Sequence, residues 1–555
     1  MPANSTEPIA ASGEVPARVA VDLRRFPWVR RLAADYAFDF PAIAPFFAGD
    51  PVDAQAWADV IARTQTHQRQ RAELATIIGA QQSRRAAPPA ARTAAQRLQD
   101  PRTVAILTGQ QAGLFGGPLF TLLKALTALK LADQASREHR VPCVAVFWID
   151  AEDHDWDEVR SCTVLDETLA PKRVSLPPRG TDDPAPVAAV RLDQHVLAVL
   201  DELEQALPGT EFRAEIMAAL RMAYAPGTGM ADAFGTWLEH LLGPRGLVVY
   251  DAADPAAKPL AGRVFTRELA VPGETARRAT QAGQDLVARG YHAQVHTHDD
   301  TLALFHLGPG RRPIRKDDGA LLVGDQRVSA ATLEQEARER PDGFSPNVLL
   351  RPIVQDTLFP TVCYVAGPNE LAYLGQLRRV YDHFGVPMPL MYPRTTATLL
   401  DSAAMRFLTK YDVAIESLQA QDDAALNELL KAQIPERVEA AFAEAGRSID
   451  AQMHQVIETI PAIDPTLEHT ARSTLSRMQH DLHTLHNKMI NAAKRRDETL
   501  RRQFSRARAL AFPGGHAQER TIAFVSFLNQ YGPSLIDRLD AELPLDLGRH
   551  WILHI

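Results

Sequence analysis

Cysteine is scarce in this chain, and the shortage excludes several kinds of protein. The 555 residues include only Cys143, Cys162 and Cys363, and no two of them form a Cys-x-x-Cys pair. An odd count without paired spacing argues against a disulfide framework and against a cysteine-rich zinc site. Apolar residues flank each cysteine, so we expect all three to be small buried core residues in a protein of the reducing cytosol.

Long apolar runs and an excess of positive charge are also missing. No uninterrupted apolar stretch reaches the roughly 18 to 20 residues that a membrane-spanning helix needs. Residues 1–15 lack the basic start and the apolar run of a signal peptide. The net charge of −8 is mild for this length and lacks the basic character of a nucleic-acid-binding protein. We therefore expect a cytoplasmic protein that binds neither membranes nor nucleic acid.

Continuous apolar runs alternate with helical segments through the first 394 residues. Residues 103–107 and 142–148 are two such runs, and residues 119–132 between them have the composition of a helix. This order is typical of a buried parallel βαβ unit, whose right-handed crossover places both strands in one sheet. Further strands are expected at 246–251, 360–365 and 387–392, and further helices at 50–100, with a break at Pro88-Pro89, and at 370–384.

The expected fold is therefore of the α/β class, with a Rossmann-like parallel-sheet core over residues 1–394. Two segments do not fit the alternation, so we interpret them as insertions in the core. Residues 165–228 are rich in proline and then helical in pattern, and residues from about 290 to 345 include short alternating runs typical of small β-hairpins. The length alone suggests about two to four domains.

After residue 394 glycine becomes rare and apolar residues recur at spacings of three and four. The pattern fills residues 438–460 and 475–492, and Pro461 and Pro465 separate the two stretches. Two long amphipathic helices joined by such a turn predict an antiparallel coiled-coil hairpin. We expect a helical arm over 395–511 that joins two copies of the chain into a homodimer, and a final segment, 512–555, that packs back on the core. Two surface helices lying on the core are the alternative.

A Gly-rich loop, TGQQAGLFGGP over residues 108–118, lies between the first predicted strand and its helix. In an open α/β sheet ligands bind at the carboxyl ends of the strands, where the amides at a helix start attract anions. The loop lacks the closing Gly-Lys-Ser/Thr of a Walker A motif. A tightly packed glycine turn without a ligand is the alternative. The candidate ligand-binding residues here are Gln110, Gln111, Gly113, Gly116, Gly117 and Lys124.

An acidic run, WIDAEDHDWDE over residues 148–158, follows the next predicted strand. Six carboxylates and one histidine fall within nine residues, and crowded carboxylates raise one another's pKa values, which suits a general base. Such a run could also bind a metal or hold an amine. The spacing of the histidine is not that of a known zinc motif, so we assign no metal ligands and leave the use of a metal open. A solvated loop that caps the next helix is the alternative. The candidate catalytic residues are Glu152, Asp153, His154 and Asp155, with Trp148 as a binding residue.

A third set of polar residues follows the strand predicted at 360–365, and a basic cluster lies near the end of the arm. The stretches RPIVQD (351–356) and YVAGPNELAY (364–373) offer a second helix start, and an arginine ends the last strand. The basic cluster is interpreted as a grip for a nucleotide phosphate, with a solvated or dimer-facing surface as the alternative. The candidate binding residues are Gln355, Asp356, Tyr364, Gly367, Asn369, Glu370, Tyr373, Arg394, Arg495, Gln518 and Arg520.

These stretches together resemble the cysteine-adding family of bacillithiol biosynthesis, BshC. The resemblance spans nearly the whole chain and follows the family's order. The matching stretches are TGQQAGLFGGPLFTLLK (108–124), VFWIDAEDHDWDEV (146–159), NVLLRPIVQD (347–356), YVAGPNELAYLGQL (364–377), MPLMYPR (388–394) and FPGGHAQER (512–520). The chain departs from the family's Gly-Pro-x-Glu at Asn369, where the family has a small residue.

The resemblance implies a fold and an activity. The fold is a Rossmann core of the class I aminoacyl-tRNA synthetase type with a coiled-coil dimerisation arm. The activity is the addition of cysteine to glucosaminyl-malate, the last step of bacillithiol synthesis, and ATP or ADP is the expected cofactor. We thus expect a ligase that activates a carboxylate with a nucleotide. The alternatives are another ATP-dependent ligase or nucleotidyl transferase, and a non-catalytic coiled-coil assembly protein.

Overall fold

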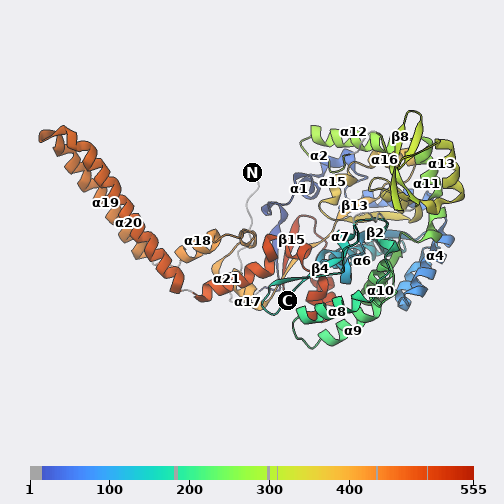
Figure 1. Ribbon diagram of the computed structural model, residues 1–555, viewed down its shortest axis with the longest axis horizontal. Helices are drawn as coiled ribbons and strands as arrows, with labels where there is room; N and C mark the ends of the chain where they lie inside the picture. Colours follow the sequence, from blue (N-terminus) through green and yellow to red (C-terminus); the bar gives the residue numbers. More distant parts are fainter. Residues whose placement is uncertain (1–15, 181–184, 297–299, 309, 433–435, 497) are drawn as a thin grey trace. The chain divides into compact units, whose positions relative to one another are not determined.

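The structure, a computed structural model, describes residues 16–180, 185–296, 300–308, 310–432, 436–496 and 498–555. Its contacts divide the chain into two compact units (Figure 1). The larger unit comprises Arg18–Thr398 and Gln518–Leu553, and the smaller comprises Leu399–Ala517 with the two chain ends. The expectation that no signal peptide is present concerns residues 1–15, which lie outside the described residues.

Five parallel strands form the central sheet of the larger unit, in the order β13-β12-β2-β3-β6. Each falls on a run predicted from continuous apolar residues, because strands covered on both faces must be apolar throughout. The predicted α/β class with a Rossmann-like parallel sheet is confirmed. The strands are β2 (Val104–Gln111), β3 (Cys143–Asp150), β6 (Val248–Asp251), β12 (Thr361–Ala366) and β13 (Leu390–Pro393).

The strand order reverses between β2 and β12. From β2 the chain adds β3 and β6 on one side of the sheet, and it later adds β12 and β13 on the other side. In open α/β sheets such a reversal leaves a crevice outside the carboxyl ends of the strands, where ligands bind. Helix α6 (Leu119–His139) links β2 to β3 and packs against β2, β3 and β12. The fold therefore directs a ligand to the ends of β2, β3 and β12.

Three helices expected between residues 50 and 100 cover the sheet. Helix α3 (Ala54–Thr66) packs on β2, β12 and β13, and α4 (Arg71–Arg84) packs on β6. Helix α5 (Pro89–Arg97) begins at the second of the two prolines, where the missing N–H costs no hydrogen bond. The predicted break at Pro88-Pro89 is confirmed.

Both predicted insertions contain elements of their own. Residues 165–228 include α8 (His195–Ala206) and α9 (Arg213–Ala223), and a hairpin of β4 (Ser161–Leu165) and β5 (Pro171–Ser175) precedes them. The second insertion holds an antiparallel sheet of order β10-β9-β8-β7-β11, as its alternating runs predicted. Its elements are β7 (Thr301–Gly308), β8 (Gly310–Asp317), β9 (Ala320–Val323), β10 (Gln326–Val328), α13 (Ala330–Glu339) and β11 (Phe344–Pro346).

The prediction of one helix over 370–384 is wrong, because the structure divides it into α15 (Glu370–Leu374) and α16 (Arg378–Phe384). The intervening turn is held by a buried side chain. Gln376 accepts hydrogen bonds from the amides of Gln294 and Val295 and donates to two backbone carbonyls. These long-range bonds compete successfully with continuation of the helix, and no local pattern in the sequence reports them.

The expectation that the segment after residue 394 is helical from its start is also wrong. Residues 396–400 form β14 (Thr396–Leu400), which completes a three-stranded sheet of order β1-β15-β14. Strands β1 (Arg18–Asp22) and β15 (Arg549–His554) pair antiparallel, although more than five hundred residues separate them. Pairing over such a separation leaves no periodic signal within either segment.

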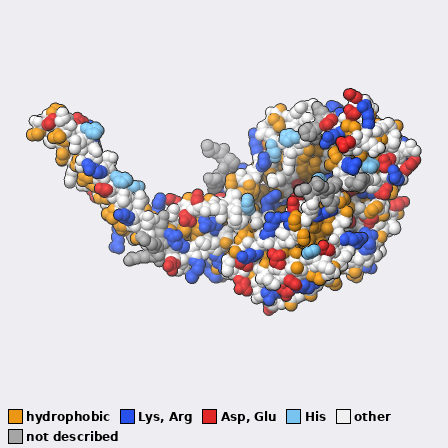
Figure 2. All heavy atoms as spheres, viewed as in Figure 1, with side chains coloured by type: hydrophobic (Ala, Val, Ile, Leu, Met, Phe, Trp, Pro, Cys, Tyr) orange, Lys and Arg blue, Asp and Glu red, His pale blue; other side chains and the backbone are white. Residues whose placement is uncertain are grey.

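The smaller unit contains the predicted helical hairpin. Helices α19 (Glu436–Thr459) and α20 (Glu468–Arg496) lie side by side (Figure 1). Gln479 bonds Asp450 and His486 bonds Glu439, so the pairing runs antiparallel. The predicted coiled-coil hairpin is thus confirmed. Histidine and hydrophobic side chains are visible along its surface (Figure 2). Helix α21 (Glu498–Ala511) packs on α17 (Ser402–Tyr411) in the same unit.

Two expectations from composition concern cysteine and membranes. All three cysteines are free and buried, as their apolar neighbours predicted. Within the described residues, none of the helices has both the length and the apolar character needed to traverse a bilayer. On the face of the larger unit visible in Figure 2, acidic and basic side chains are interspersed with hydrophobic ones.

Candidate functional site

The three polar segments predicted to meet at one edge of the sheet do so. Gln111 is in register with Asp150 across β2 and β3, and Thr108 is in register with Val365 across β2 and β12. The side-chain Nε2 of Gln111 donates a hydrogen bond to the Asp153 carboxylate at 3.1 Å. Residues 108–124, 146–159 and 364–377 therefore gather at the carboxyl ends of adjacent strands, at the crevice where the strand order reverses.

Lys124 joins the first and third of these segments. Its Nζ lies 2.8 Å from the Glu370 carboxylate and donates to Gly109 O at 2.9 Å and to Gln110 Oε1 at 3.1 Å. Burial lowers the pKa of Lys124, and the Glu370 carboxylate opposes that shift. The Glu370 carboxylate also accepts a hydrogen bond from the Gly367 amide. The side chain thus places a buried cation beside the ends of β2 and β12.

The glycines of the loop are used for packing. The amides of Gly113, Gly116 and Gly117 donate to carbonyls within the loop itself, so they are not turned toward an anion. Gly116 has a φ of +97°, and a Cβ there would collide with the ring of Phe524. This geometry favours the alternative of a packed glycine turn. The candidates of the first segment that keep polar side chains at this edge are Gln110, Gln111 and Lys124, and the two glutamines belong to the end of β2.

The acidic run contains both buried and exposed side chains: Glu152 is buried, whereas His154 and Asp155 are exposed. Glu152 is buried against Lys258 of α11 (Lys258–Ala270); burial raises the pKa of Glu152 and Lys258 opposes that shift. Asp153 accepts hydrogen bonds from Gln111 and Arg311. The His154 side chain is 55% exposed. Asp155 is exposed and caps the short helix α7 (Trp156–Val159), the role that the alternative predicted.

Four residues at this edge were not among the predicted site residues. Asp150 ends β3, and Arg351 places its Nε 3.7 Å from the Asp150 carboxylate. Arg311 of β8 reaches the edge from the second insertion and lies 3.2 Å from Asp153. Asp150 and Arg351 lie within segments that the sequence had singled out, although neither was chosen as a site residue. Lys258 and Arg311 gave no local signal, because the fold brings them in from distant elements.

Arg351 organises most of the third predicted set. It begins α14 (Arg351–Leu358), and its guanidinium donates to Gln355 and to the Tyr373 hydroxyl, both at 3.1 Å. It also lies over the ring of Tyr364, 5.8 Å from the centroid. Gln355 in turn donates to Asp356, which is fully buried and bonded to the Tyr381 hydroxyl. The set therefore holds an arginine at the edge of the sheet, with Asp356 one step further into the core.

Other predicted residues are packed or committed elsewhere. Trp148 is buried in the core and lies 5.1 Å from the ring of Tyr250. Arg394 makes a buried bidentate pair with Glu519, at 2.9 and 2.6 Å, so its guanidinium is already occupied by a carboxylate. Asn369 is exposed at the start of α15, and its side chain makes no capping hydrogen bond.

The candidates from the basic cluster and from the segment after it lie in different elements. Gln518 is buried, whereas Arg520 is exposed and lies 5.7 Å from the ring centroid of Phe120. Arg495 lies within α20, and its side chain is outside the described part of the chain.

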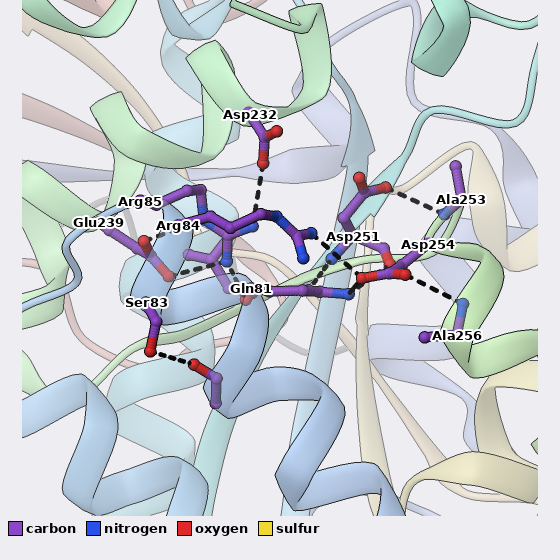
Figure 3. Close-up of polar contacts among 12 residues, drawn as sticks. Gln81, Ser83, Arg84, Arg85, Asp232, Glu239, Asp251, Ala253, Asp254 and Ala256 are labelled. Carbon is purple, nitrogen blue, oxygen red and sulfur yellow. Dashed lines mark hydrogen bonds and ion pairs between the residues drawn. The ribbon is translucent and has the colours of Figure 1, made fainter.

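A second charged cluster lies beside the edge, at the end of β6 (Figure 3). The Arg85 guanidinium donates to both carboxylate oxygens of Glu239 on α10 (Met230–Leu242), at 3.0 and 2.9 Å, and to Val249 O at 2.8 Å. Gln81 bonds both backbone groups of Asp251. Burial raises the pKa of Asp251 to about 6. This cluster fastens β6 to α4 and α10 and thereby fixes one side of the crevice.

The edge presents both signs of charge. Cationic side chains bind carboxylates and phosphates, and carboxylates bind ammonium groups, so the arrangement suits a substrate or a substrate pair that carries both. Within the described residues, no three His, Cys, Asp or Glu side chains are grouped so that they could hold a metal ion. The charged groups are Lys124, Lys258, Arg311 and Arg351 with Asp150, Glu152, Asp153 and Glu370.

Comparison with known proteins gives one consistent family. Residues 20–395 match "Bacillithiol biosynthesis BshC, N-terminal Rossmann-like domain", and residues 397–555 match its "C-terminal coiled-coil domain". A protein of Salinibacter ruber named "Putative cysteine ligase BshC" is 34% identical over 94% of this chain and 96% of its own length. Proteins of the same name from Chlorobaculum tepidum and Koribacter versatilis are 33% and 30% identical over 80% and 94% of this chain, and over 81% and 96% of their own lengths. The chain belongs to the BshC family of bacillithiol biosynthesis.

Proposed function

We propose that this protein is a cytoplasmic ligase of bacillithiol biosynthesis that joins the carboxyl group of cysteine to the amine of glucosaminyl-malate. The observation that carries the proposal is the mixed charge at the crevice of the parallel sheet. Lys124 and Arg351 are the cations there that would meet an anionic group of a ligand, and Asp150 and Asp153 are the carboxylates that would meet a cationic one. The family supplies the reaction class, since its relatives bear the name of a cysteine ligase.

The chemistry explains why both signs are needed. A free carboxylate does not react with an amine until one of its oxygens becomes a leaving group. We propose that ATP provides this step by forming an acyl phosphate or an acyl adenylate. The amine nitrogen then bonds to the acyl carbon, the carbon–oxygen bond to phosphate breaks, and the phosphate leaves with the electron pair. Fixed cations stabilise the charge that develops on these oxygens, and fixed carboxylates hold the amine.

Lys124 is the side chain best placed to meet the activated group. It is buried, it lies at the end of β2, and its position is fixed by Glu370 and by the Gly109 carbonyl. A preorganised cation of this kind contributes to the rate because it does not have to reorganise during the reaction. We therefore expect Lys124→Met to lower kcat by roughly 10²- to 10³-fold, the range seen when one preorganised donor is removed.

The proposal is tested with the purified chain, cysteine, glucosaminyl-malate and ATP. Mass spectrometry follows the amide product, and chromatography follows ATP, ADP and AMP. Lys172→Met is the matched control, because that lysine is exposed on β5. Efficient turnover of a different amino acid or acceptor would identify another ATP-dependent ligase. Partner capture through α19 and α20 without any turnover would identify an assembly protein.

We also propose that the helical hairpin joins two copies of the chain. Large apolar side chains on it remain exposed, and a second copy burying them would gain hydrophobic free energy. Leu485→Glu is expected to shift sedimentation from dimer to monomer, whereas Ser476→Glu on the same helix leaves it unchanged; a monomeric native chain contradicts the proposal. The exposed apolar residues are Val456, Ile463, Leu467, Met478, Leu485 and Met489.

A further inference from the structure

Asp150 differs from every other carboxylate of the acidic run. The run holds six carboxylates between residues 150 and 158. Among the described residues, Asp150 accepts no hydrogen bond, and its nearest cation is the Arg351 Nε at 3.7 Å. The other five carboxylates all have partners. Glu152 pairs with Lys258, and Asp153 accepts hydrogen bonds from Gln111 and Arg311. Asp155 accepts from the Glu158 backbone amide, Asp157 pairs with Arg160, and the Glu158 carboxylate is bonded by Gln111.

The position of Asp150 keeps this carboxylate open. It is the last residue of β3, in register with Gln111, and β2 and β12 end beside it at the crevice. Its side chain remains 31% exposed, so a ligand can reach it. The neighbouring cation cannot close on it, because Arg351 is already held by Gln355 and Tyr373. A carboxylate left without donors at a ligand crevice is an acceptor for a group that the ligand brings.

The charged groups around Asp150 come from four elements. Arg351 approaches from α14, Arg311 from β8, Glu370 from α15, and Asp153 from the loop that follows β3. Burial raises the pKa of Asp150, Arg351 opposes the shift, and Asp153 adds to it. A base works best when its pKa approaches the working pH. These surroundings raise the pKa of Asp150 toward that range.

We propose that Asp150 is the general base of the ligation, taking the proton from the attacking amine; this rests on the proposed function. The acceptor amine enters as an ammonium group beside the carboxylate. One N–H bond breaks and its proton moves to an Asp150 oxygen. The freed electron pair forms the bond to the activated acyl carbon, and the phosphate departs with the electrons of the broken carbon–oxygen bond. The nitrogen gives its second proton to the departing phosphate, which leaves the neutral amide. Asp150 then returns its proton to water.

The test compares Asp150→Asn with Asp157→Asn in the complete chain. Asp157 belongs to the same run but is 77% exposed and paired with Arg160, so it serves as the matched control. Asp150→Asn is expected to lower kcat by about 10²- to 10⁴-fold, with a smaller rise in the KM of the amino sugar because the ammonium group loses one opposite charge. The acid limb of the kcat/KM profile should disappear in this variant, and Asp150→Glu should restore part of the rate.

Hydroxylamine distinguishes a role of Asp150 as general base from a role in activating the carboxylate. It is uncharged near neutral pH and attacks activated carboxyl groups without a base, so Asp150→Asn should form cysteinyl hydroxamate at the native rate. An Asp150→Asn enzyme with native amide turnover and an unchanged acid limb overturns the proposal. So does an equal loss of hydroxamate and amide, since it places Asp150 in activation. If the native chain forms hydroxamate but no amide with any amino sugar, the proposed function fails instead.

Discussion

Two neighbouring strands of the parallel sheet end in charged clusters that are built in opposite ways. At the end of β6, Arg85 and Glu239 form a buried bidentate pair that is further bonded to the backbone (Figure 3). At the end of β3, Asp150 keeps a carboxylate without donors while Arg351 stays 3.7 Å away. In the first cluster both oxygens of the Glu239 carboxylate are satisfied within the protein. The second cluster leaves the Asp150 carboxylate available to a ligand. This difference distinguishes a structural ion pair from a candidate binding site.

The largest expected effect comes from breaking the closed pair. Arg85→Met leaves the Glu239 carboxylate buried without a partner, so the free energy of unfolding should fall by about 3 to 5 kcal/mol. Arg85→Met/Glu239→Leu should recover most of this loss, because neither charge then remains. Asp150→Asn, at the open cluster, should leave the stability unchanged or higher, since it removes a carboxylate that burial disfavours. Urea denaturation measures all three, and equal losses in the three variants would contradict the comparison.

Lys258→Met tests the one buried ion pair within the site itself. Glu152 would lose the lysine with which it forms a buried ion pair and keep only the longer-range attraction of Arg311, and we expect a loss of about 3 kcal/mol at neutral pH. Burial then holds the pKa of Glu152 above its usual value, so the folded variant retains a proton that the unfolded chain has released. The stability of the variant should therefore fall as pH rises. The difference from the native chain should be smaller at pH 5 than at pH 8 in urea titrations; a constant difference would contradict this.

The sequence predicted the sheet and the edge at which the site lies, for a physical reason. Strands buried on both faces are continuously apolar, and the segments that follow parallel strands must meet at the same end of the sheet. The sequence alone therefore predicts that residues 108–124, 146–159 and 364–377 lie together. Asp150 lies within the second of these segments, yet its open carboxylate depends on how its neighbours are bonded, which no pattern reports.

The rest of the site depends on contacts between distant elements. Lys258 begins a helix more than one hundred residues after Glu152, and Arg311 belongs to an antiparallel sheet in an insertion. Neither has a sequence neighbour that marks it. The break at Gly375 and the pairing of Arg394 with Glu519 likewise depend on groups far along the chain. Local periodicity describes which face is buried, whereas a charged pair depends on the finished fold.

A third buried carboxylate extends the comparison, because it accepts hydrogen bonds but has no ion pair with any described Lys or Arg side chain. Glu268 of α11 is fully buried and accepts hydrogen bonds from Thr275 and from the Ala303 amide. Burial raises the pKa of Glu268 to about 7. Between its unfolded value and about pH 7 the folded chain binds the extra proton, so stability falls as pH rises through this window.

Glu268→Gln should remove that pH dependence. Glutamine keeps an oxygen for the Ala303 amide and carries no charge at any pH. The variant should be more stable than the native chain by about 3 kcal/mol above pH 7, with the advantage vanishing below about pH 4.5. Urea denaturation at several pH values measures the difference. Parallel curves of unfolding free energy against pH for the two proteins would show that water reaches the Glu268 carboxylate and that its pKa is not raised.

The smallest expected effect lies at the outward end of the acidic run. Asp155 caps α7 by accepting a hydrogen bond from the Glu158 amide at 3.1 Å, and the helix spans only Trp156–Val159. Asp155→Ala should cost about 1 kcal/mol of local stability, whereas Asp155→Asn keeps an acceptor and should cost less. Because so short a helix opens locally, hydrogen exchange of the Glu158 amide measures the loss better than global unfolding does. Faster exchange in Asp155→Ala than in Asp155→Asn would show that this end of the run serves the fold, and identical exchange in both would return Asp155 to the candidates for ligand contact.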